Sequence, residues 1–341
     1  MRAHARGQNN NDQPTRLCIV SIQTIRSLIT NDMLAVDEVI RRNLYSDVAL
    51  VRQIGEYIIN AGGKRLRPML VLLSAGAFGY RGTAHHELAA VVEFIHTATL
   101  LHDDVVDESD LRRGRQTANA MFGNAASVLV GDFLYSRAFQ MMVRVGSMRV
   151  QEVLAEATNV IAEGEVLQLM NIHNADIDEA DYMRVIQYKT AKLFEAATRL
   201  GAIISNATPE QENAIAEYGM LLGTAFQIVD DVLDYTGDAA EIGKNLGDDL
   251  AEGKPTLPLI YTMQRGNAEQ AALARKVIEQ GGRDEFDAIV AAVRDCKALE
   301  AAMATAEQIK QQAIAKLDAL PPSQFRNTLL ELSLFAVDRK S

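Results

Sequence analysis

The 341-residue chain contains little cysteine and proline, no tryptophan and no long uninterrupted apolar run. Its two cysteines, Cys18 and Cys296, are too few for a disulfide framework or a cysteine metal site, and they fit a reducing cytoplasm. No apolar stretch reaches the ~18 residues that a membrane-spanning helix needs. Residues 1–15 are polar and lack the apolar centre of a secretory signal. We therefore expect a cytoplasmic protein with a disordered extension over residues 1–18 and one domain over residues 19–341.

Proline is absent from residues 69–208, and strand-like runs bounded by turn residues are missing there too. Apolar residues recur instead at helical spacing, as in Leu88, Val91, Val92 and Ile95. The segment Thr208-Pro209-Glu210-Gln211 combines a cap hydroxyl, a first-turn proline and the glutamine of a capping box. These patterns predict an all-α fold. The expected helices cover 19–43, 47–61, 65–79, 84–107, 117–143, 148–172, 178–205 and 209–235, with shorter ones after Pro255.

The charge balance is acidic, because 34 lysines and arginines face 45 aspartates and glutamates and give a formal net charge of −11. Such a chain is a poor partner for nucleic acid. An anionic substrate would need local cations or a metal ion to overcome this overall field.

Two clusters of aspartates share one spacing, DDxxD, and each ends an apolar helical run. The clusters are Asp103, Asp104 and Asp107, and Asp230, Asp231 and Asp234. In a helix the first and last aspartates of a cluster share a face, where like charges repel unless a cation joins them. Mg²⁺ prefers carboxylate oxygens together with substrate phosphates, so a diphosphate is the implied ligand. The alternative is that both clusters are only solvated acidic helix ends. This alternative is improbable, because two such clusters occur together and basic motifs surround them.

Basic residues follow both clusters and precede the first. Lys64 and Arg67 stand behind a glycine pair at a helix start, where free N–H groups favour anions. Arg112 and Arg113 come directly after the first cluster, and arginine forks bind phosphate oxygens in bidentate fashion. Further cations are Lys189, beside Thr190, and the lysines Lys244 and Lys254. None of these segments has the spacing of a P-loop, so ATP is not indicated.

Taken together, the motifs resemble the trans-isoprenyl diphosphate synthases, or polyprenyl synthetases. The segments that carry the resemblance are GGKRLRP, FIHTATLLHDDVVDESDLRRG, NAASVLVGDFLYSRAFQMM, EGEVLQLMN, KTAKLFEAA, GTAFQIVDDVLDY and GKNLGDDLAEGKPTLPL. The resemblance implies the isoprenoid synthase fold, a bundle of long antiparallel helices around a central apolar cavity. It also implies a homodimer, and Mg²⁺ as the cofactor, with Mn²⁺ as a substitute.

The same resemblance implies a role for each matching residue. Metal ions would bind Asp103 and Asp107, with Asp104 alongside, and Asp230, with Asp231 and Asp234 supporting. The allylic diphosphate would be held by Arg112, Lys189 and Lys244, with Lys254 nearby. Isopentenyl diphosphate would bind Lys64, Arg67, His96 and Arg113. Thr190 and Gln227 would line the reacting centre, and Gln168 replaces an acidic residue of short-chain relatives.

The implied reaction is the sequential 1′–4 condensation of isopentenyl diphosphate with an allylic diphosphate, for which we expect farnesyl diphosphate. Ala98 and Thr99 lie about 6–7.5 Å below Asp103 on the helix, and they are small where short-chain relatives carry aromatic plugs. The product tunnel should therefore pass Ile95 and end at Met142, together with Phe139 or Leu154. This interpretation predicts an octaprenyl product that serves as a quinone side-chain precursor.

Other functions remain open at this point. Geranylgeranyl, nonaprenyl and decaprenyl products are alternatives within the family. A terpene cyclase would not need the Lys64 and Arg67 pair for a second diphosphate, and a non-catalytic regulatory subunit should have lost carboxylates that are present here. Glu93 and His96 also match the Glu-x-x-His of di-iron bundles, but no other histidine has a glutamate three residues before it.

Overall fold

The computed structural model describes residues 22–59, 62–112, 114–236 and 247–338. These residues form helices joined by short turns, with one two-stranded hairpin, and this confirms the predicted all-α class. The predicted extension over residues 1–18 lies outside the described residues, as do Arg113 and Lys244.

The first half of the chain runs from α1 to α8. Its helices are α1 (Ile22–Ser27), α2 (Thr30–Leu44), α3 (Ala49–Ile59), α4 (Leu66–Ala77), α5 (Ala84–Val106), α6 (Ala118–Phe122), α7 (Asn124–Arg144) and α8 (Met148–Asn171). Strands β1 (Leu111–Arg112) and β2 (Arg115–Gln116) pair antiparallel between α5 and α6.

The second half begins with α9 (Glu179–Ile186), a π-helical turn (Gln187–Ala191), α10 (Lys192–Ile204) and α11 (Pro209–Thr236). It continues with α13 (Asp248–Ala251), α14 (Leu257–Arg265), α15 (Ala268–Gln280), α16 (Phe286–Asp295), α17 (Ala298–Lys316), a 3₁₀ turn (Leu317–Ala319) and α18 (Gln324–Asp338).

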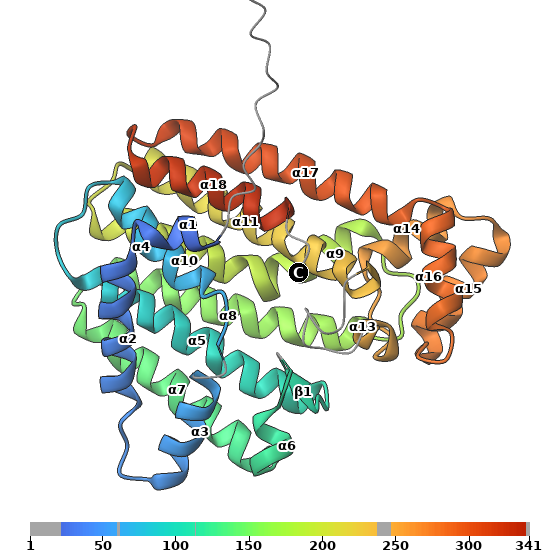
Figure 1. Ribbon diagram of the computed structural model, residues 1–341, viewed down its shortest axis with the longest axis horizontal. Coiled ribbons are helices and arrows are strands. Elements are labelled where there is room, and N and C mark those ends of the chain that lie inside the picture. Colours follow the sequence, from blue (N-terminus) through green and yellow to red (C-terminus); the bar gives the residue numbers. More distant parts are fainter. Residues whose placement is uncertain (1–21, 60–61, 113, 237–246, 339–341) are drawn as a thin grey trace, which may run out of the picture.

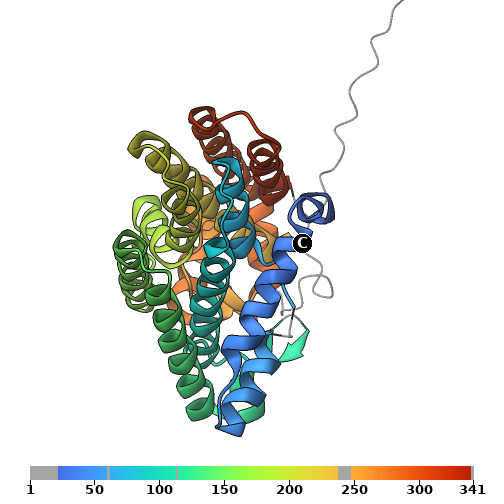
Figure 2. The same cartoon turned by 90° about the vertical axis from the view of Figure 1, so that its left-hand side faces the viewer.

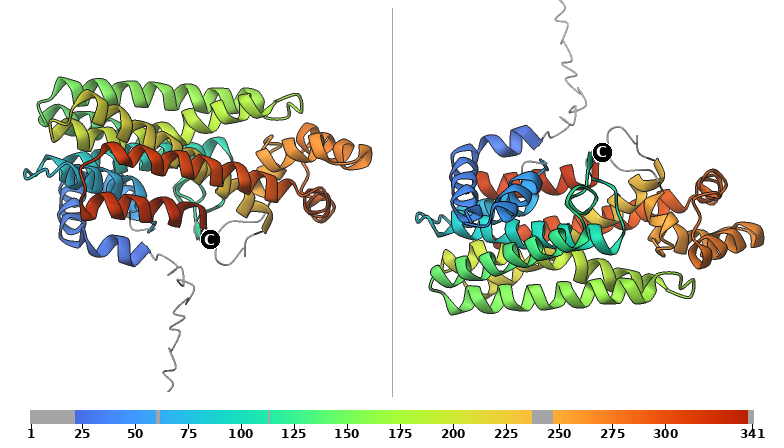
Figure 3. Two further views of the ribbon diagram at one scale, coloured as in Figure 1. Left: turned by 90° about the horizontal axis from the view of Figure 1, so that it is seen from above. Right: turned by 90° about the horizontal axis from the view of Figure 1, so that it is seen from below.

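The long helices α5, α7, α8, α10 and α11 run alongside one another and form the body of the molecule (Figure 1). Helices α17 and α18 lie along one side of it, and α14, α15 and α16 gather at one end (Figure 1). The first and last described helices, α1 and α18, lie side by side (Figure 2). Helix α8 lies on the face opposite to α1 and α2 (Figure 3).

Buried apolar side chains form two clusters, and α11 belongs to both. Tyr218 and Leu222, in its first half, pack in a cluster with helices α1 to α8, α10, the end of α17 and α18. Ile228 and Val232, further along, pack in a second cluster with α9 and α14 to α17. A single 28-residue helix therefore connects the two cores.

The start of α11 follows the predicted capping box. The Gln211 backbone N–H donates to Thr208 Oγ1 at 3.3 Å, and the Thr208 backbone N–H donates to Gln211 Oε1 at 3.1 Å. Two orphan donors at the helix end are thereby satisfied, which explains why the chain enters α11 at Pro209.

Three predicted helices are interrupted in the structure. The helix expected over 19–43 breaks between α1 and α2, and the one over 117–143 breaks at Gly123, whose φ of 84° an L side chain rarely adopts. The helix expected over 178–205 contains the π-helical turn, and the hairpin β1–β2 was not expected at all. Among the described residues, no helix combines the length and the apolar character that crossing a membrane requires.

Candidate active site

A cavity of about 680 Å³ lies between the two cores, within the ~300–1,000 Å³ typical of ligand pockets. Residues from α4, α5, α8, the π-helical turn and α11 line it, together with the segment from Asp248 to Thr256. Segments far apart in the sequence thus meet at one place. Both aspartate clusters and the glycine-pair segment contribute to its wall.

In the first cluster, Asp103 and Asp107 lie one turn apart at the end of α5 and line the cavity. Burial raises the pKa of Asp103, and the Lys189 ammonium opposes this rise. A buried carboxylate with a raised pKa lacks enough positive charge around it. A divalent cation at this position would supply that charge.

Asp104, expected alongside Asp103 and Asp107, does not line the cavity. Its side chain is fully buried, and Oδ1 accepts hydrogen bonds from Arg112 Nε and Nη2, both at 2.7 Å. Successive helical residues point about 100° apart, which turns Asp104 away from the cavity wall. Asp104 therefore fixes the guanidinium of Arg112, which itself lines the cavity.

In the second cluster, Asp230, Asp231 and Asp234 all line the cavity from α11. Both oxygens of Asp231 accept hydrogen bonds, Oδ2 from the Tyr182 hydroxyl at 2.7 Å and Oδ1 from Gln227 Nε2 at 2.8 Å. Burial raises the pKa of Asp231 to about 8, and the Asp249 carboxylate adds to the rise. The Asp234 Oδ1 atom accepts from the Gly247 backbone N–H at 3.3 Å.

Gln227 links this network to the π-helical turn. Thr190 Oγ1 donates to Gln227 Oε1 at 3.0 Å, and the amide nitrogen of Gln227 donates to Asp231. The amide is therefore held from both ends. The structure brings Thr190 and Gln227 together on the cavity wall.

The π-helical turn carries Lys189 and Thr190. Two glycines let neighbouring helices approach it: a Cβ atom at Gly164 would lie 2.6 Å from Lys189 N, and one at Gly223 would lie 2.6 Å from Ala191 Cα. Such turns occur frequently at functional sites because they shift side chains out of the regular helical register. Here the shift places Lys189 opposite α8.

Lysine side chains balance part of the negative charge. Lys189 Nζ lies 2.6 Å from Glu165, and burial raises the pKa of Glu165 to about 7 despite this contact. Lys254 Nζ lies 3.5 Å from Asp107 and 3.7 Å from Asp249, and it also contacts Glu252. Burial lowers the pKa of Lys254, but the carboxylates around it raise the pKa well above its ordinary value.

The glycine-pair segment and α5 together form the basic cradle, by which we mean Lys64, Arg67 and His96. All three line the cavity, and Arg67 Nη1 lies 3.1 Å from His96 Nε2. The Arg67 guanidinium also lies 4.8 Å from the centre of the Phe194 ring, a cation–π contact that holds it in place. Gly62 and Gly63 have φ values of 82° and 141°, so the chain turns sharply before α4.

The charges on the cavity wall do not balance. Nine carboxylates (Glu93, Asp103, Asp107, Glu165, Asp230, Asp231, Asp234, Asp248, Asp249) face six cations (Lys64, Arg65, Arg67, Arg112, Lys189, Lys254) in the described part of the chain. Diphosphate substrates would add more negative charge. Oxygen donors of this kind suit Mg²⁺, so Asp103, Asp107, Asp230 and Asp234 are the candidate ligands.

The predicted chain-length residues lie at different depths. Thr99 is on the cavity wall beside Leu100. Ile95, Ala98 and Leu154 are completely buried in the first core, and Met142 is 2% exposed there. Phe139 is instead 37% exposed on α7.

Sequence reasoning did not assign Glu165, Tyr182 or Asp249 to the site. Glu165 lies three residues before Gln168, on the same face of α8, and both line the cavity. Asp249 lies in one of the motifs that carry the resemblance, so both residues had a detectable signal. Tyr182 had none, because its contact with Asp231 arises only when α9 packs against α11.

Comparisons with known proteins agree with one another. A model of the polyprenyl synthetase family matches residues 48–294. The octaprenyl diphosphate synthase of Escherichia coli (strain K12) is 55% identical over 321 residues, 94% of this chain and 99% of that protein. The all-trans-nonaprenyl-diphosphate synthase (geranyl-diphosphate specific) of Rhodobacter capsulatus is 45% identical over 93% of this chain and 98% of its own. A crystal structure of the polyprenyl synthase from Caulobacter crescentus CB15, complexed with calcium and isoprenyl diphosphate, has a TM-score of 0.92 at 43% identity, covering 95% of this chain and 99% of that one.

Proposed function

This chain belongs to the polyprenyl synthetase family and is a long-chain prenyltransferase, and we propose that it makes octaprenyl diphosphate from isopentenyl diphosphate and farnesyl diphosphate. Sequence identity supports an octaprenyl product. The octaprenyl diphosphate synthase of Escherichia coli is 55% identical to this chain, whereas the nonaprenyl enzyme of Rhodobacter capsulatus is 45% identical. We infer that the product becomes a quinone side chain, and that the enzyme acts in the cytoplasm.

One observation carries the proposal: two aspartate clusters and a separate basic cradle line the same cavity. A terpene cyclase binds one diphosphate and would have no use for the second set of cations. Family members without catalytic function would not need both clusters intact. The cavity therefore fits an enzyme that joins two diphosphate substrates.

Mg²⁺ would be held by Asp103 and Asp107 on α5 and by Asp230 and Asp234 on α11, and Mn²⁺ could take its place. When bound, it would neutralise charge on the diphosphate and help the allylic carbon–oxygen bond to break. Asp104 and Asp231 would act behind these ligands, since their oxygens already hold Arg112, Tyr182 and Gln227. Side chains that hold the groups around a metal site in this way fix the geometry of the metal ligands.

The chain's cations would hold the two substrates at different places. Arg112, Lys189 and Lys254, with Lys244, would bind the allylic diphosphate beside the aspartates. Lys64, Arg67 and His96, with Arg113, would bind isopentenyl diphosphate at the start of α4, where the backbone N–H groups also favour an anion.

In each round the allylic carbon–oxygen bond breaks and its electrons leave with the diphosphate. The double bond of isopentenyl diphosphate then attacks the allylic carbon, and a proton leaves to the departing diphosphate. Thr190 and Gln227 would form the wall beside the reacting carbons, with Gln227 oriented by Asp231. No side chain of the protein needs to form a covalent bond.

We further infer one domain over residues 19–341 and a homodimer. The shared helix α11 supports the single domain. Exposed apolar side chains on the outer faces of α7 and α8 support the dimer: Leu129 and Val143 on α7 are 66% and 58% exposed, and Val166 and Leu169 on α8 are each 58% exposed. Sedimentation at the mass of one chain would refute the dimer.

The test is a product assay. Purified protein is incubated with farnesyl diphosphate, labelled isopentenyl diphosphate and Mg²⁺, and the products are separated by chain length. Octaprenyl diphosphate as the main product supports the proposal. Accumulation of geranylgeranyl diphosphate, or a cyclised hydrocarbon with no incorporated label, would contradict it.

A further inference from the structure

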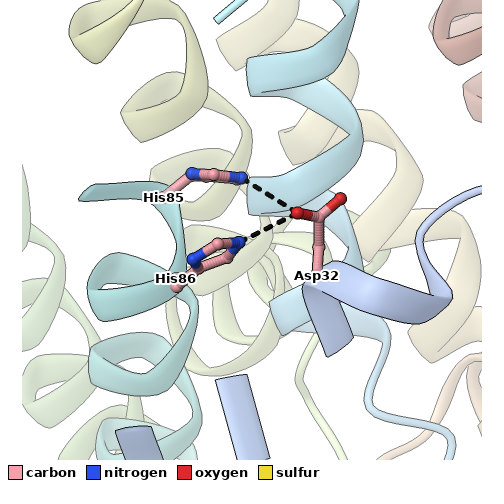
Figure 4. A group of neighbouring side chains, drawn as sticks. All are labelled: Asp32, His85 and His86. Atoms are coloured by element: carbon pink, nitrogen blue, oxygen red, sulfur yellow. Dashed lines mark hydrogen bonds and ion pairs between the residues drawn. The ribbon is translucent and has the colours of Figure 1, made fainter. Parts of the chain in front are cut away.

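A cluster of one carboxylate and two imidazole side chains lies outside the cavity, where α2 meets α5. Asp32 is in the first turn of α2, and His85 and His86 are in the first turn of α5 (Figure 4). The nearest carboxylate oxygen, Asp32 Oδ1, lies 2.9 Å from His86 Nε2 and 3.4 Å from His85 Nε2. None of the three residues lines the catalytic cavity.

The convergence of the two imidazoles is not explained by helix geometry. Consecutive helical residues point about 100° apart, so neighbouring side chains normally diverge. Here the ring centroids are only 3.9 Å apart, and both rings direct Nε2 toward the same oxygen. A simple ion pair between α2 and α5 would need one histidine, and the second would be free to turn elsewhere.

The separations between these atoms suit a shared metal ion. One donor atom from each residue lies within 4.8 Å of the other two. Two ligands bound tetrahedrally to Zn²⁺ at ~2.0–2.1 Å are about 3.3 Å apart, close to the observed 2.9 and 3.4 Å. A small adjustment of the side chains would therefore complete three ligands. Water could occupy the remaining position.

The surroundings also suit a transition metal. The side chains of His85 and His86 are 13% and 16% exposed, while Asp32 is 37% exposed and leaves an opening to solvent. The edge-on ring of Tyr80, 5.2 Å from His85, packs behind the cluster.

We propose that Asp32, His85 and His86 form a binding site for a divalent transition metal, with Zn²⁺ as the expected ion, that fastens α2 to α5. Two nitrogen donors and one carboxylate favour Zn²⁺ or Co²⁺ over Mg²⁺, which prefers oxygen. The site is distinct from the aspartate clusters in both position and ligand type. It would stabilise the N-terminal helices and is not required for the prenyl transfer itself.

The experiment titrates the full-length, untagged protein with Zn²⁺ in the presence of excess Mg²⁺, which occupies the carboxylate sites. Variants His86→Ala and Asp32→Asn remove one ligand each. The matched control is Asp132→Asn, which removes the carboxylate 3.4 Å from the single imidazole of His102. Circular dichroism confirms that each variant is folded.

We expect wild type and Asp132→Asn to bind one more equivalent of Zn²⁺ than either ligand variant, and to melt at a higher temperature when Zn²⁺ is added. Co²⁺ should give an intense visible absorption band in wild type that His86→Ala loses, as expected for a low-coordinate site containing nitrogen. Equal Zn²⁺ stoichiometry in all four proteins would overturn the proposal, because binding would then lie elsewhere. So would a wild type that binds no Zn²⁺ under these conditions.

Discussion

Aspartates within one motif do different work, because each points in its own direction from the helix. Asp103 and Asp107 line the cavity, whereas Asp104, between them, holds Arg112. Asp231 likewise has both oxygens engaged by Tyr182 and Gln227. In the first cluster the spacing DDxxD therefore combines two aspartates that line the cavity with one that positions a neighbouring arginine.

The two diphosphate sites can be separated by substitution. Lys64→Ala and Arg67→Ala should raise the KM for isopentenyl diphosphate by about tenfold or more, since each removes a charge-assisted contact with that substrate. Arg112→Ala should chiefly raise the KM for the allylic substrate. Steady-state kinetics with each substrate varied in turn gives the answer, with the exposed Lys276→Ala as control. An effect of all three variants on the allylic side alone would refute the cradle.

The raised pKa of Asp231 makes stability depend on pH when metal is removed. Its folded pKa of about 8 lies far above the unfolded value of about 3.9, so the native state holds a proton that the unfolded chain has lost. Stability should therefore fall as pH rises between about 4 and 8. In Asp231→Asn this fall should be smaller. Urea denaturation in EDTA across that pH range measures the free energy of unfolding of both proteins. An identical dependence on pH in wild type and Asp231→Asn would contradict the raised pKa of Asp231.

At the scale of elements, the local sequence determined the long helices but not their interruptions. Helix α5 was expected over 84–107 and covers 84–106, and α11 was expected over 209–235 and covers 209–236, because apolar spacing and the capping box mark them. No sequence pattern of this kind indicates the π-helical turn. It depends on the close approach of α8 and α11 at Gly164 and Gly223, which only the folded chain reveals.

In the candidate site, too, some features could be predicted from the sequence and others could not. The aspartates, Lys64 and Arg67 could be singled out from the sequence, since charge of one sign at helical spacing implies a counterion nearby, whereas His96 came only from the family resemblance. The contacts made by Tyr182 and Glu165 were not, because they join segments that are distant in the sequence. The direction of Asp104 needed the position of Arg112, which depends on the unexpected hairpin.

The close approach at Gly223 can be tested directly. In Gly223→Ala the new Cβ would lie 2.6 Å from Ala191 Cα, and overpacking of this kind costs about 1–3 kcal/mol. The π-helical turn should shift, separating Thr190 from Gln227 and lowering kcat. The matched control is Gly55→Ala, where the nearest atom is the movable Leu44 Cδ2 at 3.2 Å. Equal stability and rates in the two variants would show that the contact does not matter.

At the scale of the whole molecule, the cavity lies where the two hydrophobic cores meet. Leu66 belongs to one core and Ile186 to the other, and both line it. Helix α11 passes through both cores and carries the second aspartate cluster. The second aspartate cluster is therefore anchored in both cores, and the cavity has apolar side chains on both sides.

Product length should respond to bulk at Thr99, the predicted chain-length residue that lines the described cavity. Thr99→Tyr places a ring below Asp103, so the main products should shorten to farnesyl or geranylgeranyl diphosphate while condensation continues. Thr99→Ser, which keeps the space, should leave the long product unchanged. Chromatography of labelled products gives the distribution, and a long product from the tyrosine variant would rule out this path for the chain.

The central claim is that two aspartate clusters on α5 and α11 act together in one metal-dependent reaction. The most direct measurement is the single-turnover rate of Asp103→Ala and of Asp230→Ala with saturating Mg²⁺ and both substrates, beside the exposed control Asp132→Ala. Each cluster variant should lose at least about 10²-fold in rate, since each removes stabilisation of charge in the transition state. Its helical circular dichroism should match wild type. A near-normal rate in either cluster variant would contradict the account.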